Sequence, residues 1–380
     1  MKIINKAILP PGFEANGVAS GIKKNNRELD LALFYSQVPA KGSCLFTTNS
    51  FAAACVKINK KNLKLNKEFK AILANSGNAN AFTGKRGMDD AMKIIDDLAD
   101  ILKVEKKEVL LASTGIIGKR LPVVKIRSYL RSLVNGLSKE GIDRAKYAIM
   151  TTDTFPKELT IKFNLGKKSI TLCGVAKGAG MISPNLATML VFIFTDANIA
   201  SVALEKALKE AAEISFNCIT VDGCMSTNDT VIILANGLAG NPVIQKNSYA
   251  FICFKNALKK LCLDLARLIV RDAEGATKFI QIKVDKARSF KEAKEAALSI
   301  ANSNLFKTAL YGENPNFGRI VAAIGASGVR VREDKLKIKV SPLQRKEIKV
   351  NVILNQGKAR ALVYTSDLTP QYIKINAQYN

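Results

Sequence analysis

The sequence contains no histidine and no tryptophan. Without an imidazole, neither a Ser-His-Asp triad nor a Cys-His pair can form. A hydroxyl nucleophile in this chain therefore needs another base, which can be a lysine, a carboxylate or its own α-amine at a chain terminus.

Long apolar runs and a secretory signal are also missing. No run approaches the roughly 18 apolar residues that span a membrane, and the start "MKIINKAILPPG" lacks the apolar core of a signal peptide. We therefore expect a soluble, cytoplasmic protein that is not bound to a membrane. With 380 residues, of which 48% are hydrophobic, the chain is long enough for one large domain or two ordinary ones.

The cysteines are scattered and form no C-x-x-C pair. There are seven of them: Cys44, Cys55, Cys173, Cys218, Cys224, Cys253 and Cys262. Their odd number and wide spacing are typical of free, mostly buried thiols in a reducing compartment. Because zinc sites need closely spaced Cys and His ligands, we expect no metal.

Acidic residues are few relative to basic ones, which gives a net charge of +26. Clustered Lys and Arg would indicate nucleic-acid binding through phosphate contacts. Here the lysines are dispersed along the chain, and aromatic residues make up only 7% of it, so platforms for base stacking are poor. A general lysine bias spread over solvated surfaces explains the charge better, although nucleic-acid binding stays open as an alternative.

Hydrophobic periodicity predicts an α/β protein with sheets packed against helices. Strands are expected at residues 29–36, 70–75, 159–164, 189–196, 230–236, 279–284 and 348–354. Helical spacing of apolar residues predicts helices over residues 88–104, 201–214, 254–270 and 289–303. No change in composition marks a domain boundary.

Several segments are rich in Gly, Asn and Thr but poor in charge. They are "ANSGNANAFTG" (74–84), "ASTGIIG" (112–118), "TTDTFPK" (151–157), "STNDT" (226–230) and "GENPNFGRI" (312–320). One such loop is ordinary turn chemistry. Several in one chain suggest a site, because loops on a rigid scaffold are where functional groups collect.

A further segment of this kind, within "VAKGAGMISPNLATMLVFIFTDA" (175–197), leads through Ala187-Thr188 into an apolar run. Cleavage before Thr188 would give this threonine a free α-amine, whose ordinary pKa of about 8 suits a base near neutral pH. The small Ala187 leaves room for attack on its carbonyl. Thr188 can also be a β-branched residue that begins a strand, and the pattern alone leaves both interpretations open.

The long segment "KGAGMISPNLATML" resembles the self-cleavage site of the glutamate N-acetyltransferase / ornithine acetyltransferase family of arginine biosynthesis. Other segments resemble that family in the same order, so that the resemblance covers nearly the whole chain. They are "ANSGNANAFTG", "STGIIG", "TTDTFPK", "DGCMSTNDT", "RDAEGATKF", "NPNFGRI" and "DLTPQYIKINAQY".

This resemblance implies a self-cleaving N-terminal-threonine acyltransferase fold. The cut would fall between Ala187 and Thr188 and leave an α chain (1–187) and a β chain (188–380) with Thr188 at its N-terminus. Members of the family keep the two chains associated, and we expect a heterotetramer of two α and two β chains.

The resemblance also implies the reaction and its residues. Thr188 would be the nucleophile that moves an acetyl group from N-acetylornithine to glutamate, and some members also use acetyl-CoA as donor. Thr114 and Gly115 match the positions of the oxyanion hole. The residues that match substrate-binding positions are Thr152, Lys177, Thr188, Glu274 and Asn376. No bound cofactor or metal is implied.

Two other functions remain as alternatives. A self-cleaving amidase or aminopeptidase of related fold would resolve the acyl-enzyme with water. A nucleic-acid-binding protein would account for the positive charge and would not need Thr188. Lys177 and Glu274 favour an amino-acid acceptor, because a lysine suits its carboxylate and a glutamate suits the cationic amine of ornithine.

Overall fold

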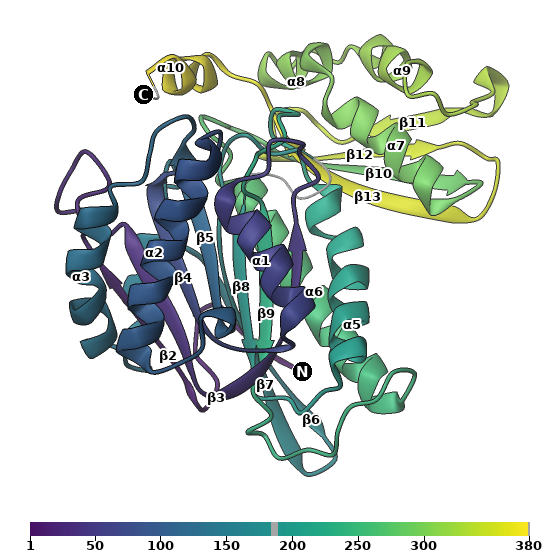
Figure 1. Ribbon diagram of the computed structural model, residues 1–380. Coiled ribbons are helices and arrows are strands. Elements are labelled where there is room, and N and C mark those ends of the chain that lie inside the picture. Colours follow the sequence, from purple (N-terminus) through teal and green to yellow (C-terminus); the bar gives the residue numbers. More distant parts are fainter. Residues whose placement is uncertain (184–188, 379–380) are drawn as a thin grey trace. The chain divides into compact units, whose positions relative to one another are not determined.

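The protein is described by a computed structural model in which residues 1–183 and 189–378 are placed. It forms two compact units (Figure 1). The first consists of the described parts of 1–178, 188–212 and 226–265, and the second of those of 179–187, 213–225 and 266–380. Each unit is thus assembled from separate stretches of chain.

The first unit contains both strands and helices. Its strands are β1 (Lys2–Ile4), β2 (Phe13–Val18), β3 (Leu31–Phe46), β4 (Glu68–Asn78), β5 (Val109–Ile116), β6 (Lys157–Leu165), β7 (Lys168–Lys177), β8 (Leu190–Thr195) and β9 (Thr230–Ala235). Its helices are α1 (Ala54–Leu65), α2 (Gly84–Leu102), α3 (Val123–Asn135), α4 (Ile142–Ala148), α5 (Ser201–Glu213) and most of α6 (Tyr249–Arg271).

The strands pair in the order β1-β6-β7-β8-β9-β3-β4-β5, and β2 pairs with β3. Strand β3 serves two sections of this sheet. Its first part pairs with β2, its last part, Lys41–Phe46, pairs with β9, and the register against β4 shifts between Tyr35 and Ala40. A shift of this kind bends a strand, so the two sections can face each other.

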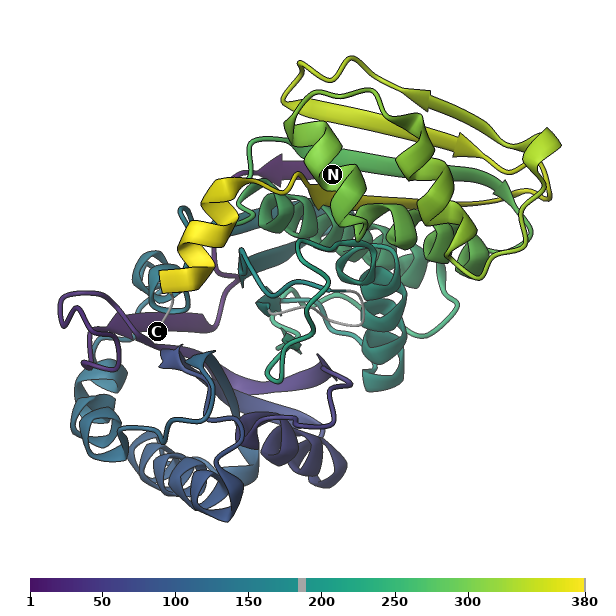
Figure 2. The same cartoon turned by 90° about the horizontal axis from the view of Figure 1, so that it is seen from above.

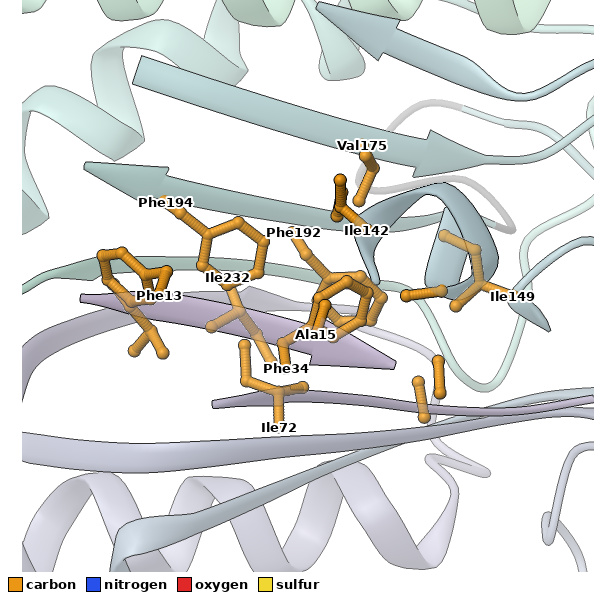
Figure 3. Close-up of a cluster of buried hydrophobic side chains, with 14 of the residues drawn as sticks. Phe13, Ala15, Phe34, Ile72, Ile142, Ile149, Val175, Phe192, Phe194 and Ile232 are labelled. Atoms are coloured by element: carbon orange, nitrogen blue, oxygen red, sulfur yellow. The ribbon is translucent and has the colours of Figure 1, made fainter. Parts of the chain in front are cut away.

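The main core of the first unit lies between these two sections (Figure 3). Phe34 of β3 meets Phe192 and Phe194 of β8, with ring centroids 4.9 and 5.2 Å apart. Phe13 of β2 meets Phe194 at 5.2 Å. Full burial of each such ring contributes about 2–3 kcal/mol, and the aromatic contacts hold β8 against β2 and β3.

Helices cover both outer faces of this sandwich. Buried residues of α1, α2 and α3 form a second core with Leu73 of β4 and Leu111 of β5. On the other side, Gly174 of β7 lies so close to α6 that an added Cβ would be 2.8 Å from Leu265. The unit therefore has helix–sheet–sheet–helix layers, as Figure 1 shows.

The second unit has a four-stranded sheet in the order β11-β12-β10-β13. Its elements are β10 (Phe279–Ala287), α7 (Phe290–Ala301), α8 (Asn304–Tyr311), α9 (Phe317–Gly325), β11 (Lys337–Val340), β12 (Glu347–Ile353), β13 (Ala359–Ser366) and α10 (Pro370–Gln378). Helices α7, α8 and α9 pack on one face of this sheet (Figures 1 and 2). The core between them includes Ile282, Ala297 and Val350.

The predicted α/β class, with sheets packed against helices, is confirmed, and each predicted strand and helix overlaps an observed element. The segment 112–118 differs from its predicted loop, because Ala112 to Ile116 belong to β5, which pairs in parallel with β4. Among the described residues, no helix combines the length and the apolar character needed to cross a membrane.

Candidate active site

The candidate residues of the first unit lie where four strands begin or end. Lys177 is the last residue of β7 and pairs with Leu190, the first residue of β8. Leu190 in turn pairs with Thr230, the first residue of β9. Thr114 and Gly115 lie near the end of β5. Ala187 and Thr188 lie outside the described residues, and Met189, which follows Thr188, leads into β8.

Lys177 and Thr114 are in direct contact. The Lys177 Nζ donates a hydrogen bond to Thr114 Oγ1 over 3.2 Å, and the two residues are 2% and 3% exposed. A buried ammonium group is costly unless polar or charged groups compensate it. The structure thus places Lys177, which is predicted to bind substrate, in contact with Thr114, which is predicted for the oxyanion hole, and both are buried.

Asp153 supplies the compensating charge. Its Oδ1 accepts the Gly178 N–H at 2.7 Å and the Lys157 Nζ at 2.5 Å, and its Oδ2 accepts the Thr151 N–H at 2.9 Å. Burial alone would raise the pKa of Asp153, but Lys177 and Lys157 hold it at about 2. The carboxylate is therefore charged at neutral pH and balances part of the positive charge of both lysines.

Gly115 occupies a position that only glycine fits. Its φ is +129°, in the region that favours glycine. A Cβ built there would lie 2.3 Å from the Gly77 carbonyl carbon and 2.5 Å from the Asn78 nitrogen, both of them backbone atoms of β4. Strands β4 and β5 therefore approach closely at the residue predicted for the oxyanion hole.

Two residues of "STNDT" that come directly before β9 hold this region in place. Asn228 donates its side-chain amide to Ala79 O at 2.6 Å and to Ser113 O at 2.8 Å, next to Thr114. Asp229 Oδ1 accepts the Met189 N–H at 3.2 Å, one residue after Thr188. Burial raises the pKa of Asp229 well above its usual range, against the opposing effects of the Met189 N–H and of Lys177.

The other candidates are placed as follows. Thr152 lies in the bend before β6, one residue before Asp153. In the second unit, Asn376 of α10 donates to Glu274 Oε2 at 2.8 Å. Contacts among the predicted residues thus join Thr114 to Lys177 and Glu274 to Asn376, each pair within its own unit.

Asp153, Asn228 and Asp229 lie in polar loop motifs, for which the sequence predicts loop support through Asx-type hydrogen bonds and no chemical step. Asn228 does hold backbone groups, as that interpretation expects. Asp229 also holds a backbone group, the Met189 N–H. Asp153 does more, because its charge balances part of the positive charge of two buried lysines. A polar loop with an acid near a lysine is the only local signal of the Asp153 pairing.

Close relatives identify the class of enzyme. Over its full length the chain is 44% identical to the "Arginine biosynthesis bifunctional protein ArgJ" of Caldanaerobacter subterraneus subsp. tengcongensis, which is itself covered completely. It is 45% identical to the protein of the same name from Geobacter sulfurreducens, with 97% of this chain and 98% of that protein aligned.

Solved structures with similar sequences include the ArgJ protein of Bacillus halodurans, at 32% identity and a TM-score of 0.45. That match covers 50% of this chain and 98% of the solved one. A second is the ornithine acetyltransferase of Mycobacterium tuberculosis in complex with ornithine, at 35% identity and a TM-score of 0.45, covering 48% of this chain and 97% of that one.

The two relatives aligned over nearly their full length are both bifunctional proteins of arginine biosynthesis by name, and this chain is of the same class. The family model described as "ArgJ family" matches residues 14–344. The chain belongs to the ArgJ family.

Proposed function

We propose that this chain is a precursor that cuts itself between Ala187 and Thr188, and that Thr188 then carries an acetyl group from N-acetylornithine to glutamate. The observation that supports this most directly is the buried contact of Lys177 with Thr114, next to Gly115. These groups surround the end of the sheet at which Met189, the neighbour of Thr188, enters β8.

In the first half-reaction, Thr188 Oγ attacks the acetyl carbonyl carbon and the Thr188 α-amine takes the hydroxyl proton. Thr114 Oγ1 accepts a bond from Lys177, so its own proton can point to the oxyanion. The Thr114 hydroxyl and the Gly115 N–H are the two donors, and each contributes about 2.7–4 kcal/mol in a comparable site. Collapse breaks the acetyl C–N bond, and ornithine leaves with the proton on its amine.

In the second half-reaction, the neutral amine of glutamate attacks the acetyl-threonine ester. The C–O bond to Thr188 breaks, and the Thr188 Oγ recovers a proton through the α-amine. No redox change takes place, so the cycle needs no bound cofactor. We propose acetyl-CoA as an alternative donor: free Thr188 Oγ would attack its thioester carbonyl, the C–S bond would break with CoA leaving as the thiol, and the same acetyl-threonine ester would form.

Charges at the site suit amino-acid substrates. Lys177 offers an ammonium group for the α-carboxylate, and Asp153 and Lys157 hold the loop before β6 next to it. Thr152 lies on that loop and is assigned to the same substrate. In the second unit, Glu274 is assigned to the cationic side chain of ornithine, with Asn376 fixing the orientation of its carboxylate.

The strand order supports lasting association of the α chain (1–187) and the β chain (188–380). Strands β8 and β9 of the β chain lie between β7 and β3 of the α chain. The ladder between β7 and β8 runs from Leu172 and Thr195 to Lys177 and Leu190. Separation of the two chains would expose this buried sheet, so both remain in one body, and we propose that two such pairs form a heterotetramer.

A reducing, cytoplasmic setting is part of the same proposal. All seven cysteines are free thiols, and burial raises the pKa of Cys44, Cys173 and Cys262. Such thiols are protonated and unreactive at neutral pH.

The test follows acetyl transfer from N-acetylornithine with and without glutamate. The proposal predicts glutamate-dependent transfer, its loss in Thr188→Ala, and its retention at a reduced rate in Thr188→Ser, which keeps a hydroxyl. Consumption of N-acetylornithine that is equally fast without glutamate would indicate the amidase alternative. Salt-sensitive retention on DNA or RNA that survives Thr188→Ala, with no transfer by the wild type, would indicate nucleic-acid binding.

Lys177 and Lys157 provide a matched pair of variants. Both are buried and both interact with Asp153, but only Lys177 contacts Thr114. Lys177→Met should abolish transfer, whereas Lys157→Met should mainly lower stability. Equal losses of activity at equal stability would contradict the assignment of Lys177 to the substrate.

A further inference from the structure

The chain segment that precedes the predicted cut is held by Asp222. The Met181 N–H donates to Asp222 Oδ2 at 2.6 Å, and the Ile182 N–H donates to Oδ1 at 2.9 Å. Met181 takes a left-handed conformation with φ +55°, which turns both N–H groups to the same carboxylate. The backbone is therefore fixed up to six residues before Thr188.

Neighbouring backbone groups strengthen this attachment. The Ile182 carbonyl accepts the Val221 N–H at 2.9 Å and the Thr220 hydroxyl at 3.0 Å. Behind them, the buried Lys307 donates to the Val221 carbonyl and, over 3.3 Å, to Thr365 Oγ1 of β13. Asp222 thus stands on a rigid support that belongs to the sheet of the second unit.

The same carboxylate also holds the C-terminal helix. The Tyr372 hydroxyl of α10 donates to Asp222 Oδ2 at 3.2 Å. Burial and the nearby Asp222 both raise the pKa of Tyr372, so its phenol keeps the proton that it donates. Asp222 Oδ2 therefore receives one bond from the segment before the cut and one from α10.

These contacts close into a ring through two of the proposed substrate-binding residues. One turn after Tyr372, Asn376 donates to the Tyr372 carbonyl at 3.1 Å and to Glu274 Oε2 at 2.8 Å. The Glu274 N–H then donates to Ala179 O at 3.0 Å, two residues before Met181. Gly180 lies so close to Glu274 that an added Cβ would be 2.3 Å from the carboxyl carbon.

We infer that Asp222 is a positioning residue that aligns the segment leading to the cut and, through Tyr372, the helix that carries Asn376. This inference rests on the proposed function. One carboxylate would then have two separable effects. Its hydrogen bonds from Met181 and Ile182, the first arm, control self-cleavage. Its hydrogen bond from Tyr372, the second arm, controls the affinity for N-acetylornithine.

Two variants separate the arms. Tyr372→Phe removes only the bond to α10, so it should leave the half-time of cleavage unchanged. It should raise the KM for N-acetylornithine about tenfold or more at nearly constant kcat, as loss of a hydrogen bond to a charged group does. Asp222→Asn places an amide donor where Oδ2 accepted two bonds, so it should slow cleavage and raise the KM as well.

Ser289→Ala is the control. It removes the N-cap of α7, where Ser289 accepts the Glu292 N–H, and so destabilises the same unit without touching the ring. Cleavage would be followed by intact mass during cell-free synthesis, and KM and kcat would be measured on fully cleaved enzyme. The control should change the melting temperature but neither the half-time nor the KM.

The outcomes are distinct. An unchanged KM in Tyr372→Phe, or equal effects of Tyr372→Phe and Ser289→Ala, would overturn the inference while wild-type cleavage and transfer uphold the proposed function. A wild type that neither cleaves nor transfers would overturn both. Slower cleavage in Tyr372→Phe would show that the arms are not separable and would also contradict the inference.

Discussion

Asp153→Asn should be strongly destabilising, because Asp153 is the anion between two buried lysines. The substitution keeps the shape of the side chain but removes its charge. Lys157 is fully buried and Lys177 is 2% exposed. Both lysines would then lose the anion that they share. Loss of one partner from a buried ion pair costs about 3–5 kcal/mol.

The pKa of Asp153 gives a second, independent value for the stability that its charge contributes. The carboxyl has a pKa of about 2 in the folded protein against an ordinary 3.8. Between these values the folded state binds fewer protons than the unfolded state. Stability from this group is therefore complete above about pH 4 and falls as the pH drops from about 4 to about 2, by about 2 kcal/mol in all. We expect a loss of about 2–4 kcal/mol at pH 7.

Urea unfolding in a Thr188→Ala background, where a single uncut chain is expected, measures this loss at pH 7 and at pH 2.5. The difference in unfolding free energy between the background protein and its Asp153→Asn derivative should shrink on the acid side. Asp196→Asn is the matched control, since Asp196 is a buried acid that accepts the Thr171 N–H but whose pKa is raised by burial. An Asp153→Asn difference that is the same at both pH values would refute a charged, paired Asp153.

Further predictions concern the oxyanion hole, the core and a buried lysine. Gly115→Ala should cost about 2–5 kcal/mol in urea unfolding and abolish transfer, because its Cβ meets β4 backbone atoms. Gly118→Ala, with φ +82° and open space around its Cβ, should cost only about 1–2 kcal/mol. Phe192→Ala should lower the unfolding free energy by about 3–5 kcal/mol, since the ring is fully buried between strands; a loss below about 1 kcal/mol would contradict the packing. Burial lowers the pKa of Lys307 from 10.5 to about 8, so the unfolded state binds more protons between these values. As the pH rises from 8 to 10.5, Lys307 should therefore increase the unfolding free energy by about 3 kcal/mol. A rise of the same size in Lys307→Met would show that Lys307 is not its source.

Much of the fold could be predicted because its signals are local. The apolar stripe of residues 88–104 and the alternation in 279–284 correspond to α2 and β10. Strand β3 extends ten residues beyond its predicted end at Ser36. Pro39 argues against a continuous strand, but the irregular register between Tyr35 and Ala40 accommodates it. Pro39 therefore signals the irregularity, but the continuation of the strand beyond it depends on pairing with β4 and β9.

The two-unit division could not be predicted for a similar reason. Residues 213–225 and 266–380 join one unit although a stretch of the other separates them. No linker or change in composition is needed where the chain passes between units within helix α6.

The sequence yields candidates for the chemistry of the site, and their roles stay predictions. The absence of histidine and the resemblance to a family led to Thr188, Thr114 and Lys177. The contact between Thr114 and Lys177 spans 63 residues of sequence, so spacing could not reveal it. The Asp153 pairing and the Asp222 ring also join distant segments, and only the fold places their charges together.

The most direct test of the central claim is intact mass spectrometry of denatured wild type after incubation with N-acetylornithine in the absence of glutamate. We expect two fragments that meet between Ala187 and Thr188, with one acetyl group added to the β fragment and removed again by glutamate. Thr188→Ala should stay uncut and unacetylated. A single uncut wild-type chain, or an acetyl group on the α fragment, would contradict the claim that Thr188 is the self-generated nucleophile.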